Sequence, residues 1–105
     1  MSDYSLPNKF DRIIHQPSRL SILAVLAGCE SADFVYMQGA TGLTKGTLSK
    51  HLKKLEDAGY IAIVKTFKGS YPNTSAALTK AGRKAFKKYR RQYGTFTRLI
   101  ESEDS

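Results

Sequence analysis

The stretch that decides the fold is residues 43–61, LTKGTLSKHLKKLEDAGYI. Thr44 can cap the N-terminus of a helix, because its hydroxyl oxygen accepts a hydrogen bond from a free backbone N–H. Gly59 can end that helix, since glycine readily adopts the left-handed conformation that helix C-termini favour. At about 100° per residue one narrow stripe of the helix is apolar and consists of Leu48, Leu52 and Leu55. The stretch therefore predicts a helix over residues 45–58 that is anchored on a core by leucines.

A second helix is expected before this one, separated from it by a tight turn. It covers residues 34–40, because Asp33 can cap its N-terminus and Gly42 allows the chain to turn sharply. Two short helices joined by a glycine-containing turn form a helix-turn-helix unit, here residues 34–58. The major groove of B-DNA is about 12 Å wide and admits one helix. The pattern thus predicts that the helix over residues 45–58 enters the major groove of DNA.

The outer face of that helix is cationic and rich in hydroxyl groups. Gly46 leaves room for a close approach to DNA, and the N-terminal half of such a helix usually lies nearest the base edges. The side chains predicted to contact DNA at this end are Thr44, Lys45, Thr47, Ser49 and Lys50. Lys53 and Lys54 lie further along and are predicted to contact phosphates, which fix register without reading sequence. An ordinary solvated helix surface is the alternative interpretation.

The periodicity changes from helical to strand-like after residue 59. The β-forming residues that follow are Tyr60, Ile61, Ile63, Val64 and Phe67. Residues 68–73 are rich in turn formers, and residues 74–78 can return as a second strand. The pattern predicts a hairpin with a fairly long loop over residues 60–78. As a wing, this hairpin would present Lys65, Lys68 and Tyr71 to the DNA backbone or the adjacent minor groove. A plain hairpin with an exposed aromatic side chain is the alternative.

Three further helices complete the predicted order. Two short ones are expected over residues 9–14 and 18–27, and Thr79 can cap a long last helix over residues 79–101. The predicted fold class is therefore mainly α with a small β-hairpin. It is a winged helix-turn-helix in which four helices precede the hairpin and one long dimerisation helix follows it. We expect residues 1–105 to form one domain, since half of this length is too short for a separate core.

The last helix has two different faces. Apolar and aromatic side chains recur every three to four residues and form a stripe of Phe86, Tyr89, Tyr93, Phe96 and Ile100. This stripe is longer than a small core can cover, so we predict that its distal part packs against the same helix of a second copy in a two-fold homodimer. Packing onto the first helix of the same chain is the alternative. The rest of the first half of the helix is basic and contains Lys80, Arg83, Lys84, Lys87, Lys88, Arg90 and Arg91.

The charge of the chain is unevenly distributed. The formal net charge is +8. Residues 44–91 contain 13 of the 17 Lys and Arg side chains but only Glu56 and Asp57 of the nine acidic ones. A basic block within a foldable segment is typical of proteins that bind a polyanion. A surface charged only for solubility is the alternative interpretation.

Several functional classes find no support in the residues. Cys29 is the single cysteine, so no internal disulfide can form, which fits a reducing cytoplasm. His51, at the edge of the leucine stripe, is expected to be packed and hydrogen-bonded. Without a cluster of metal ligands, a catalytic set or a phosphate-binding glycine loop, we expect no metal, no cofactor and no enzyme activity. Residues 1–10 lack the apolar core of a secretion signal, and the longest apolar run, residues 22–27, is too short to cross a bilayer. A cytoplasmic protein without a membrane partner is therefore expected.

Residues 43–61 resemble the helix-turn-helix of ArsR- and MarR-like winged-helix regulators. The specific combination within this stretch is Ser49, His51, Leu52 and Gly59. Further along, the chain resembles a compact subgroup of winged-helix DNA-binding domains, at Pro72, Thr74, Leu78, Thr79, Gly82, Arg83, Ala85 and Phe86. The likeness spans roughly residues 9–93. At the wing tip the chain has the sequence SYPN over residues 70–73, where relatives often carry Lys or Arg.

The resemblance implies a dimeric regulator that binds a pseudo-palindromic operator, often as a repressor, and that dimerises through its first and last helices. It also leaves a small-molecule effector open, because MarR-like proteins often bind one between the dimer helices and the DNA-binding lobe. The main prediction is a homodimeric, sequence-specific transcriptional regulator that binds double-stranded DNA. Two alternatives remain: a winged helix whose basic face docks an acidic protein, and an architectural protein that binds duplex DNA without sequence preference.

Overall fold

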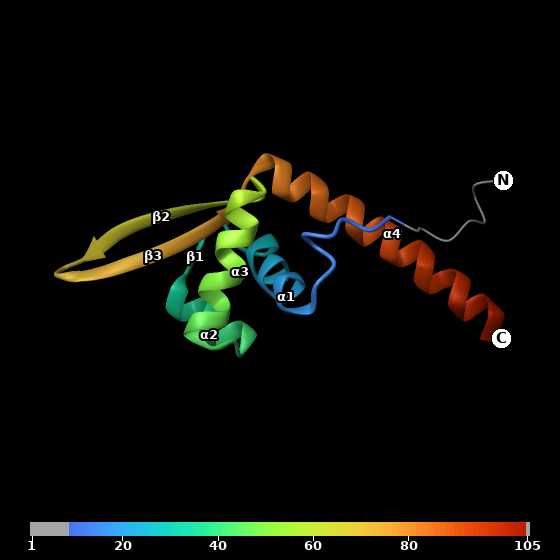
Figure 1. Cartoon of the computed structure of the whole chain (residues 1–105), viewed down its shortest axis with the longest axis horizontal. Coiled ribbons are helices and arrows are strands. Elements are labelled where there is room, and N and C mark those ends of the chain that lie inside the picture. Colours follow the sequence, from blue (N-terminus) through green and yellow to red (C-terminus); the bar gives the residue numbers. More distant parts are fainter. Residues whose placement is uncertain (1–8, 105) are drawn as a thin grey trace.

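The computed structural model describes residues 9–104, and the polar N-terminal residues 1–8 lie outside the described part. The elements are α1 (Pro17–Ala27), β1 (Ala32–Asp33), α2 (Phe34–Thr41), α3 (Lys45–Asp57), β2 (Ile61–Lys68), β3 (Tyr71–Leu78) and α4 (Lys80–Asp104). The β2–β3 hairpin and α4 project from the body in opposite directions (Figure 1). These projections give a radius of gyration of 16.1 Å, against about 13 Å for a compact chain of this length. The helix-turn-helix, the hairpin and the long last helix follow one another as predicted.

One cluster of buried apolar side chains holds these elements together. Its members from α1 and α3 are Ile22, Leu23, Leu26, Leu48, Leu52 and Leu55, and all of them are at most 3% exposed. The sheet and α4 add Ile61, Ala76, Phe86 and Tyr89. Burying one large apolar side chain contributes about 1.5–3 kcal/mol relative to leaving it in water. The predicted leucine stripe is thus confirmed as the anchor that turns the opposite face of α3 to solvent.

Both ends of α3 are capped at the predicted residues. The Thr44 hydroxyl oxygen accepts a hydrogen bond from the backbone N–H of Thr47 at 3.2 Å. Gly59 has φ of 79° just beyond the helix. The N–H of Tyr60 then bonds back to the carbonyl oxygen of Leu55 at 3.0 Å, which is the Schellman arrangement. These local hydrogen bonds set the length of α3.

A short strand that the sequence did not predict precedes α2. β1 pairs antiparallel with Ser75 and Ala76, so the sheet has the order β1-β3-β2. This strand is only two residues long and its partners lie about 40 residues later in the chain, so no local periodicity indicates it. Asp33 then caps α2 as predicted, because its Oδ1 accepts a hydrogen bond from the Tyr36 N–H at 2.8 Å.

The β2–β3 hairpin is longer than predicted and its loop is shorter. Only Gly69 and Ser70 connect the two strands, and Gly69 has φ of 63°, as the first position of a type II′ loop requires. Pro72 lies within β3, at a pair without hydrogen bonds to β2. Its missing N–H therefore faces solvent and leaves the ladder intact. The predicted loop over residues 68–73 is wrong, and both strands reach the tip.

Residues 9–14 do not form the predicted helix. The Asp11 Oδ1 atom accepts hydrogen bonds from the N–H groups of Ile13 at 2.8 Å and Ile14 at 3.2 Å. An aspartate that bonds its neighbouring backbone in this way offers the chain an alternative to helical hydrogen bonding. The segment therefore makes a single turn, and α1 begins separately with Gln16 as its N-cap. The described chain has four helices and three strands in place of the five helices and two strands predicted.

The start of α4 is fixed by a close contact with the corner between α3 and β2. The Thr79 hydroxyl accepts from the Gly82 N–H at 3.0 Å and donates to the Gly59 carbonyl oxygen at 2.6 Å. Gly82 is required here, since a Cβ at this position would lie 1.9 Å from the carbonyl oxygen of Tyr60. From this contact α4 continues without interruption through Gly94.

Candidate nucleic-acid interface

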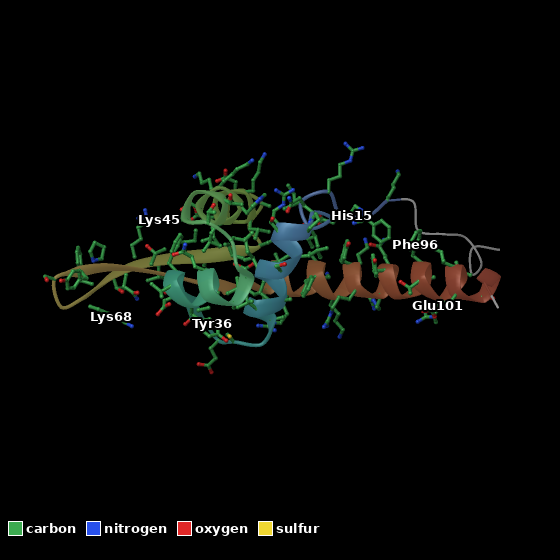
Figure 2. All side chains as sticks on the ribbon, turned by 90° about the horizontal axis from the view of Figure 1, so that it is seen from below. His15, Tyr36, Lys45, Lys68, Phe96 and Glu101 are labelled. Carbon is green, nitrogen blue, oxygen red and sulfur yellow. The ribbon has the colours of Figure 1, made fainter. Side chains whose placement is uncertain are left out.

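The outer face of α3 gathers most of the side chains that were predicted to contact DNA. Exposed on it are Lys45, Ser49, Lys50, Lys53 and Lys54, with Gly46 among them. Figure 2 shows Lys45 on one side of the molecule, above the hairpin in that view. The first turn of α3 carries no acidic side chain, so the free N–H groups and the helix dipole add to the positive charge at this end. This surface suits a polyanion.

Two hydroxyl groups are linked at the N-terminus of α3. The Thr44 hydroxyl donates to the Thr47 hydroxyl oxygen at 2.9 Å while it accepts from the Thr47 backbone N–H. The proton of the Thr47 hydroxyl is therefore directed away from Thr44 and is free to bond another acceptor. Thr44 orders the helix terminus, and Thr47 offers a donor beside it.

An acidic group interrupts the cationic face near the C-terminal end of α3. The Asp57 Oδ1 atom lies 3.1 Å from the Lys53 Nζ atom, and both side chains are exposed. The hydrogen bond and the negative charge of Asp57 raise the pKa of Lys53. The ion pair neutralises part of the Lys53 charge, and the carboxylate repels phosphate. The N-terminal half of α3 is consequently its more attractive part for DNA.

His51 ties α3 to α1 on the buried side of the helix. Its side chain is 6% exposed, and its Nδ1 atom lies 3.1 Å from Nη1 of Arg19. Burial, followed by the positive charges of Arg19 and Lys50, lowers the pKa of His51. Because a guanidinium can only donate, Nδ1 accepts and the ring is neutral. His51 is thus packed and hydrogen-bonded, as the sequence predicted.

One face of the hairpin continues the core side of the sheet. Ile61 is buried and Ile63 is half-buried on this face, so the alternation of side chains along a strand places Lys65 and Phe67 there too. Phe67 is 73% exposed and was not singled out in the sequence, where it counted only as a strand former. Counting every second residue from Ile61 is the signal that could have placed it beside Lys65.

The opposite face of the hairpin carries the other two wing candidates. The Lys68 Nζ atom lies 3.7 Å from the Asp33 Oδ2 atom. Tyr71 stands directly opposite Lys68 in the strand register and shares its face. Figure 2 shows Lys68 on the other side of the hairpin from Lys45 of α3. The structure therefore brings Lys65 together with the α3 side of the molecule, and separates Lys68 and Tyr71 from it.

The aromatic stripe of α4 divides between the core and open surface. Phe86 and Tyr89 are 7% and 3% exposed within one chain, which leaves them little area for a partner. Tyr93 and Ile100 remain 49% and 42% exposed, and Phe96 is half-buried. The surface that a second copy can cover thus lies on the distal half of α4.

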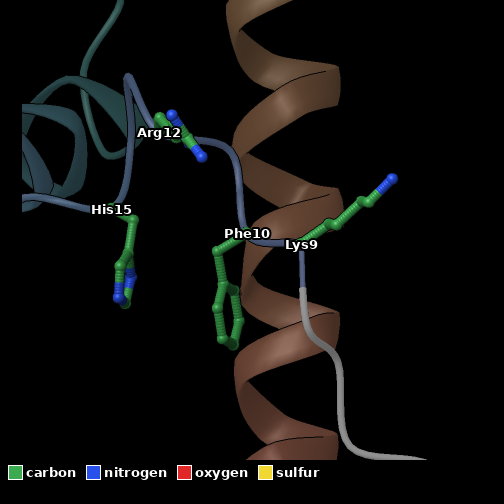
Figure 3. Close-up of a pocket in the computed structure, with 4 residues that line it drawn as sticks. All are labelled: Lys9, Phe10, Arg12 and His15. Atoms are coloured by element: carbon green, nitrogen blue, oxygen red, sulfur yellow. The ribbon is translucent and has the colours of Figure 1, made fainter.

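The segment before α1 covers part of this stripe. The ring of Phe10 stacks on His15 with centroids 4.8 Å apart and meets Phe96 edge-on at 6.1 Å. The His15 Nδ1 atom lies 2.7 Å from the hydroxyl of Tyr89. A groove of about 490 Å³ is lined here by Lys9, Phe10, Arg12 and His15. Figure 3 shows the rings of Phe10 and His15 side by side along α4. Intramolecular packing therefore accounts for the proximal stripe, through an irregular segment where a helix was predicted.

The described part of the chain shows neither a cluster of metal ligands nor a membrane-spanning helix. Among the side chains that the structure describes, those of residues 9–102, no three His, Cys, Asp or Glu side chains come close enough together to hold a metal ion. None of the helices over the same residues combines the length and the apolar character needed to span a membrane. Cys29 is half-buried and unpaired by any disulfide.

A helix-turn-helix with an exposed cationic second helix, followed by a hairpin and a long helix, defines the class of winged-helix DNA-binding proteins. The family model described as "Winged helix DNA-binding domain" matches residues 18–95, and the chain belongs to this family. An uncharacterized protein of Methanocaldococcus jannaschii is 38% identical to it over 78 residues, which is 74% of this chain and 85% of that protein.

Solved structures of transcriptional regulators share the fold. A transcriptional regulator homologue from Pyrococcus horikoshii OT3 matches with a TM-score of 0.73 and 26% identity, over 90% of this chain and 91% of that one. A MarR-family regulator from Silicibacter pomeroyi matches with a TM-score of 0.61 and 18% identity, over 87% of this chain and 58% of that one. The chain is thus a DNA-binding winged helix similar to transcriptional regulators, and the predicted resemblance is confirmed.

Proposed function

We propose that this protein is a homodimeric, sequence-specific transcriptional regulator that inserts the N-terminal half of α3 into the major groove of double-stranded DNA. The observation that carries the proposal is the cationic, hydroxyl-bearing face of α3, which stands opposite three fully packed leucines. A helix that reads bases needs such anchoring, because a small shift of its axis would misplace every base contact.

The side chains of the interface take different roles in this proposal. Lys45, Thr47, Ser49 and Lys50 carry donors toward the base-edge acceptors of the major groove. Lys53, Lys54 and Lys65 bond phosphates and fix the register of the protein on DNA. Thr44 holds the helix terminus in place. Lys68 and Tyr71 lie on the far face of the wing, so they contribute less than Lys65.

The dimer is proposed to form through the distal half of α4. Tyr93 and Ile100 support this, because they remain exposed on a helix that projects from the body, and the half-buried Phe96 lies between them on the same stripe. Replacing Ile100 with Glu buries a charge in that interface. Sedimentation equilibrium should then show at least a tenfold rise in the dimer dissociation constant, while Ile100→Leu leaves the dimer intact. A monomeric wild-type protein at micromolar concentration would refute the dimer.

The two-fold symmetry determines the kind of DNA site. Two α3 helices related by a two-fold axis read two half-sites about one helical turn apart, so the operator is pseudo-palindromic. A dimer bound at such a site competes with the transcription machinery, which makes repression the expected mode. A regulator that binds the DNA of the cell acts inside it, so we expect the protein in the cytoplasm.

Selection of binding sites from a random duplex pool, followed by salt titration, tests the proposal. The selected site should bind about 10³-fold or more tightly than a scrambled duplex. Lys50→Ala should lower affinity for that site at least tenfold. Lys68→Ala removes the same charge from the far face of the wing and should change affinity less than threefold.

Each other outcome points to a different function. Tight binding to both duplexes without preference identifies an architectural DNA binder. Weak binding to both identifies a module that docks an acidic protein. A specific site whose affinity survives Lys50→Ala unchanged refutes the assignment of the α3 face while keeping the regulator.

A further inference from the structure

The proximal half of α4 carries a second cationic surface, which the proposed role of α3 leaves unused. Six exposed side chains form this basic stripe: Lys80, Arg83, Lys84, Lys87, Lys88 and Arg91. At about 100° per residue, Lys80, Lys84, Lys87, Lys88 and Arg91 point away from Phe86 and Tyr89, which face the core, and Arg83 lies at the edge of the stripe, about 60° from Phe86. Among the described side chains, those of residues 9–102, the ion pairs are those of Lys53 and Lys68, and neither involves a member of the stripe.

The basic stripe is unfavourable for α4 itself. Like charges three or four residues apart destabilise a helix, and the stripe contains several such pairs, among them Lys84 with Lys88 and Lys87 with Arg91. The first turn of α4 holds no acidic side chain, so the cations there lie at the positive end of the helix dipole. A surface needed only for solubility could mix both signs of charge. This one keeps a single sign at a cost to folding.

We propose that the basic stripe binds the sugar–phosphate backbone of a second segment of double-stranded DNA while α3 occupies the first. Residues 80–91 span about 16 Å along the helix axis, and a duplex of that length carries about ten phosphate charges. α4 leaves the body at the C-terminal end of α3 and runs away from the hairpin (Figure 1). The stripe is therefore a separate surface from the interface formed by α3 and the wing.

The composition of the stripe favours duplex backbone over other polyanions. Protein partners are usually held by aromatic or other large anchors, and single-stranded DNA stacks its bases on aromatic rings. The exposed large apolar side chains of the described chain lie on α2, on the hairpin and on the distal half of α4, at Val35, Tyr36, Val64, Phe67, Tyr71, Tyr93 and Ile100. None of them interrupts the stripe, so charge is what it offers.

The test uses full-length protein whose α3 helices are saturated with a short unlabelled operator. A fluorescent non-operator duplex is then titrated in, and its anisotropy is measured. The wild-type complex should bind it with an affinity that falls steeply with salt. Replacing Lys84, Lys87, Lys88 and Arg91 with Gln should weaken this second binding at least tenfold. Operator affinity should change less than threefold, and the melting temperature at low salt should rise because the repulsion is relieved.

A charge-conserving variant and an operator-free arm complete the test. Lys84→Arg/Lys87→Arg/Lys88→Arg should bind the second duplex like the wild type. Lys45→Gln/Lys50→Gln/Lys54→Gln should lose sequence preference yet still bind duplex through α4, which separates this proposal from the role of α3. The proposal is overturned if the operator-saturated complex does not bind the second duplex, or if the variant with Gln at residues 84, 87, 88 and 91 binds it like the wild type. It is also overturned if polyglutamate displaces the labelled duplex better than unlabelled duplex does.

Discussion

Two lysines of the same strand provide the sharpest test of how the wing meets DNA. Lys65 and Lys68 both lie on β2 and both are exposed. Lys65 shares the face of the strand that carries Ile61 toward the core. Lys68 lies on the other face, where its ammonium stands 3.7 Å from Asp33. If DNA approaches from the α3 side, Lys65→Ala removes a phosphate contact and Lys68→Ala does not.

The size of the effect follows from counterion release. Each lost phosphate contact lowers the slope of log K against log salt by about 0.9. A dimer has two wings, so Lys65→Ala should lower the slope by about 1.8. When the salt concentration rises from 50 to 200 mM, the factor by which affinity falls should then be about 12 times smaller for the variant than for the wild type. Lys68→Ala should leave the slope within about 0.5 of the wild-type value.

The assay is fluorescence anisotropy with a labelled operator at four or more salt concentrations. Lys65→Arg is the control, since it keeps the charge on the same face of the wing. Circular dichroism should show that the variants stay folded, because an exposed ion pair such as that of Lys68 contributes at most about 1 kcal/mol. Equal slopes for the two alanine variants, or a larger drop for Lys68→Ala, would refute the orientation of the wing.

Three further predictions concern the frame around α3 and its charge. The pKa of His51 is lowered in the folded protein. As the pH falls, the unfolded chain therefore binds the proton before the folded chain does. The free energy of unfolding should consequently fall as the pH drops below about 6.5. Urea titrations at pH 7.5 and 5.5 measure this loss, and His51→Gln should flatten it. Gly82→Ala should lower the free energy of unfolding, measured in urea, by about 1–3 kcal/mol or more, because its Cβ would lie 1.9 Å from a carbonyl oxygen. The control is Gly39→Ala, whose Cβ would lie in open space and which should be neutral or stabilising. Asp57→Asn frees Lys53 and should tighten operator binding and steepen the salt slope by up to about 0.9 per protomer. Unchanged affinity and slope in fluorescence anisotropy would show that this end of α3 stays off the DNA.

The helix-turn-helix could be predicted from sequence because its signals are local. The caps at Thr44 and Gly59 and the leucine stripe all lie within the same helix or beside it, so each could be recognised without knowledge of the rest of the fold. The packed, hydrogen-bonded state of His51 followed from its position at the edge of that stripe.

Features that depend on distant partners could not be predicted. β1 exists because β3 lies beside it, and Pro72 is tolerated in a strand because the ladder faces away from its ring nitrogen. The segment expected to form a helix over residues 9–14 is held instead by Asp11, whose Oδ1 accepts from the N–H groups of Ile13 and Ile14 and whose Oδ2 accepts from the distant hydroxyl of Tyr60.

The candidate interface shows the same limit. A stripe with helical periodicity looks identical whether it packs inside one chain or between two, so Phe86 and Tyr89 could not be separated from Tyr93 and Ile100 until the fold was known. The assignment of residues to the two faces of the wing depends on the strand register. The sequence did not give this register, because the loop was predicted to be longer than it is. Once Ile61 is known to point inward, alternation along β2 assigns Lys65 and Lys68 to opposite sides.

The most direct measurement attaches a DNA-cleaving iron chelate to a single cysteine on the outer face of α3. The protein would carry Ser49→Cys with Cys29→Ser, and its control would carry Ser21→Cys, a matched change on the exposed side of α1. A chelate at position 49 should cut the operator within each half-site, and one at position 21 should leave those positions uncut. Cleavage that is equal from the two sites, or absent from position 49 while the operator stays bound, would contradict the placement of α3 in the major groove.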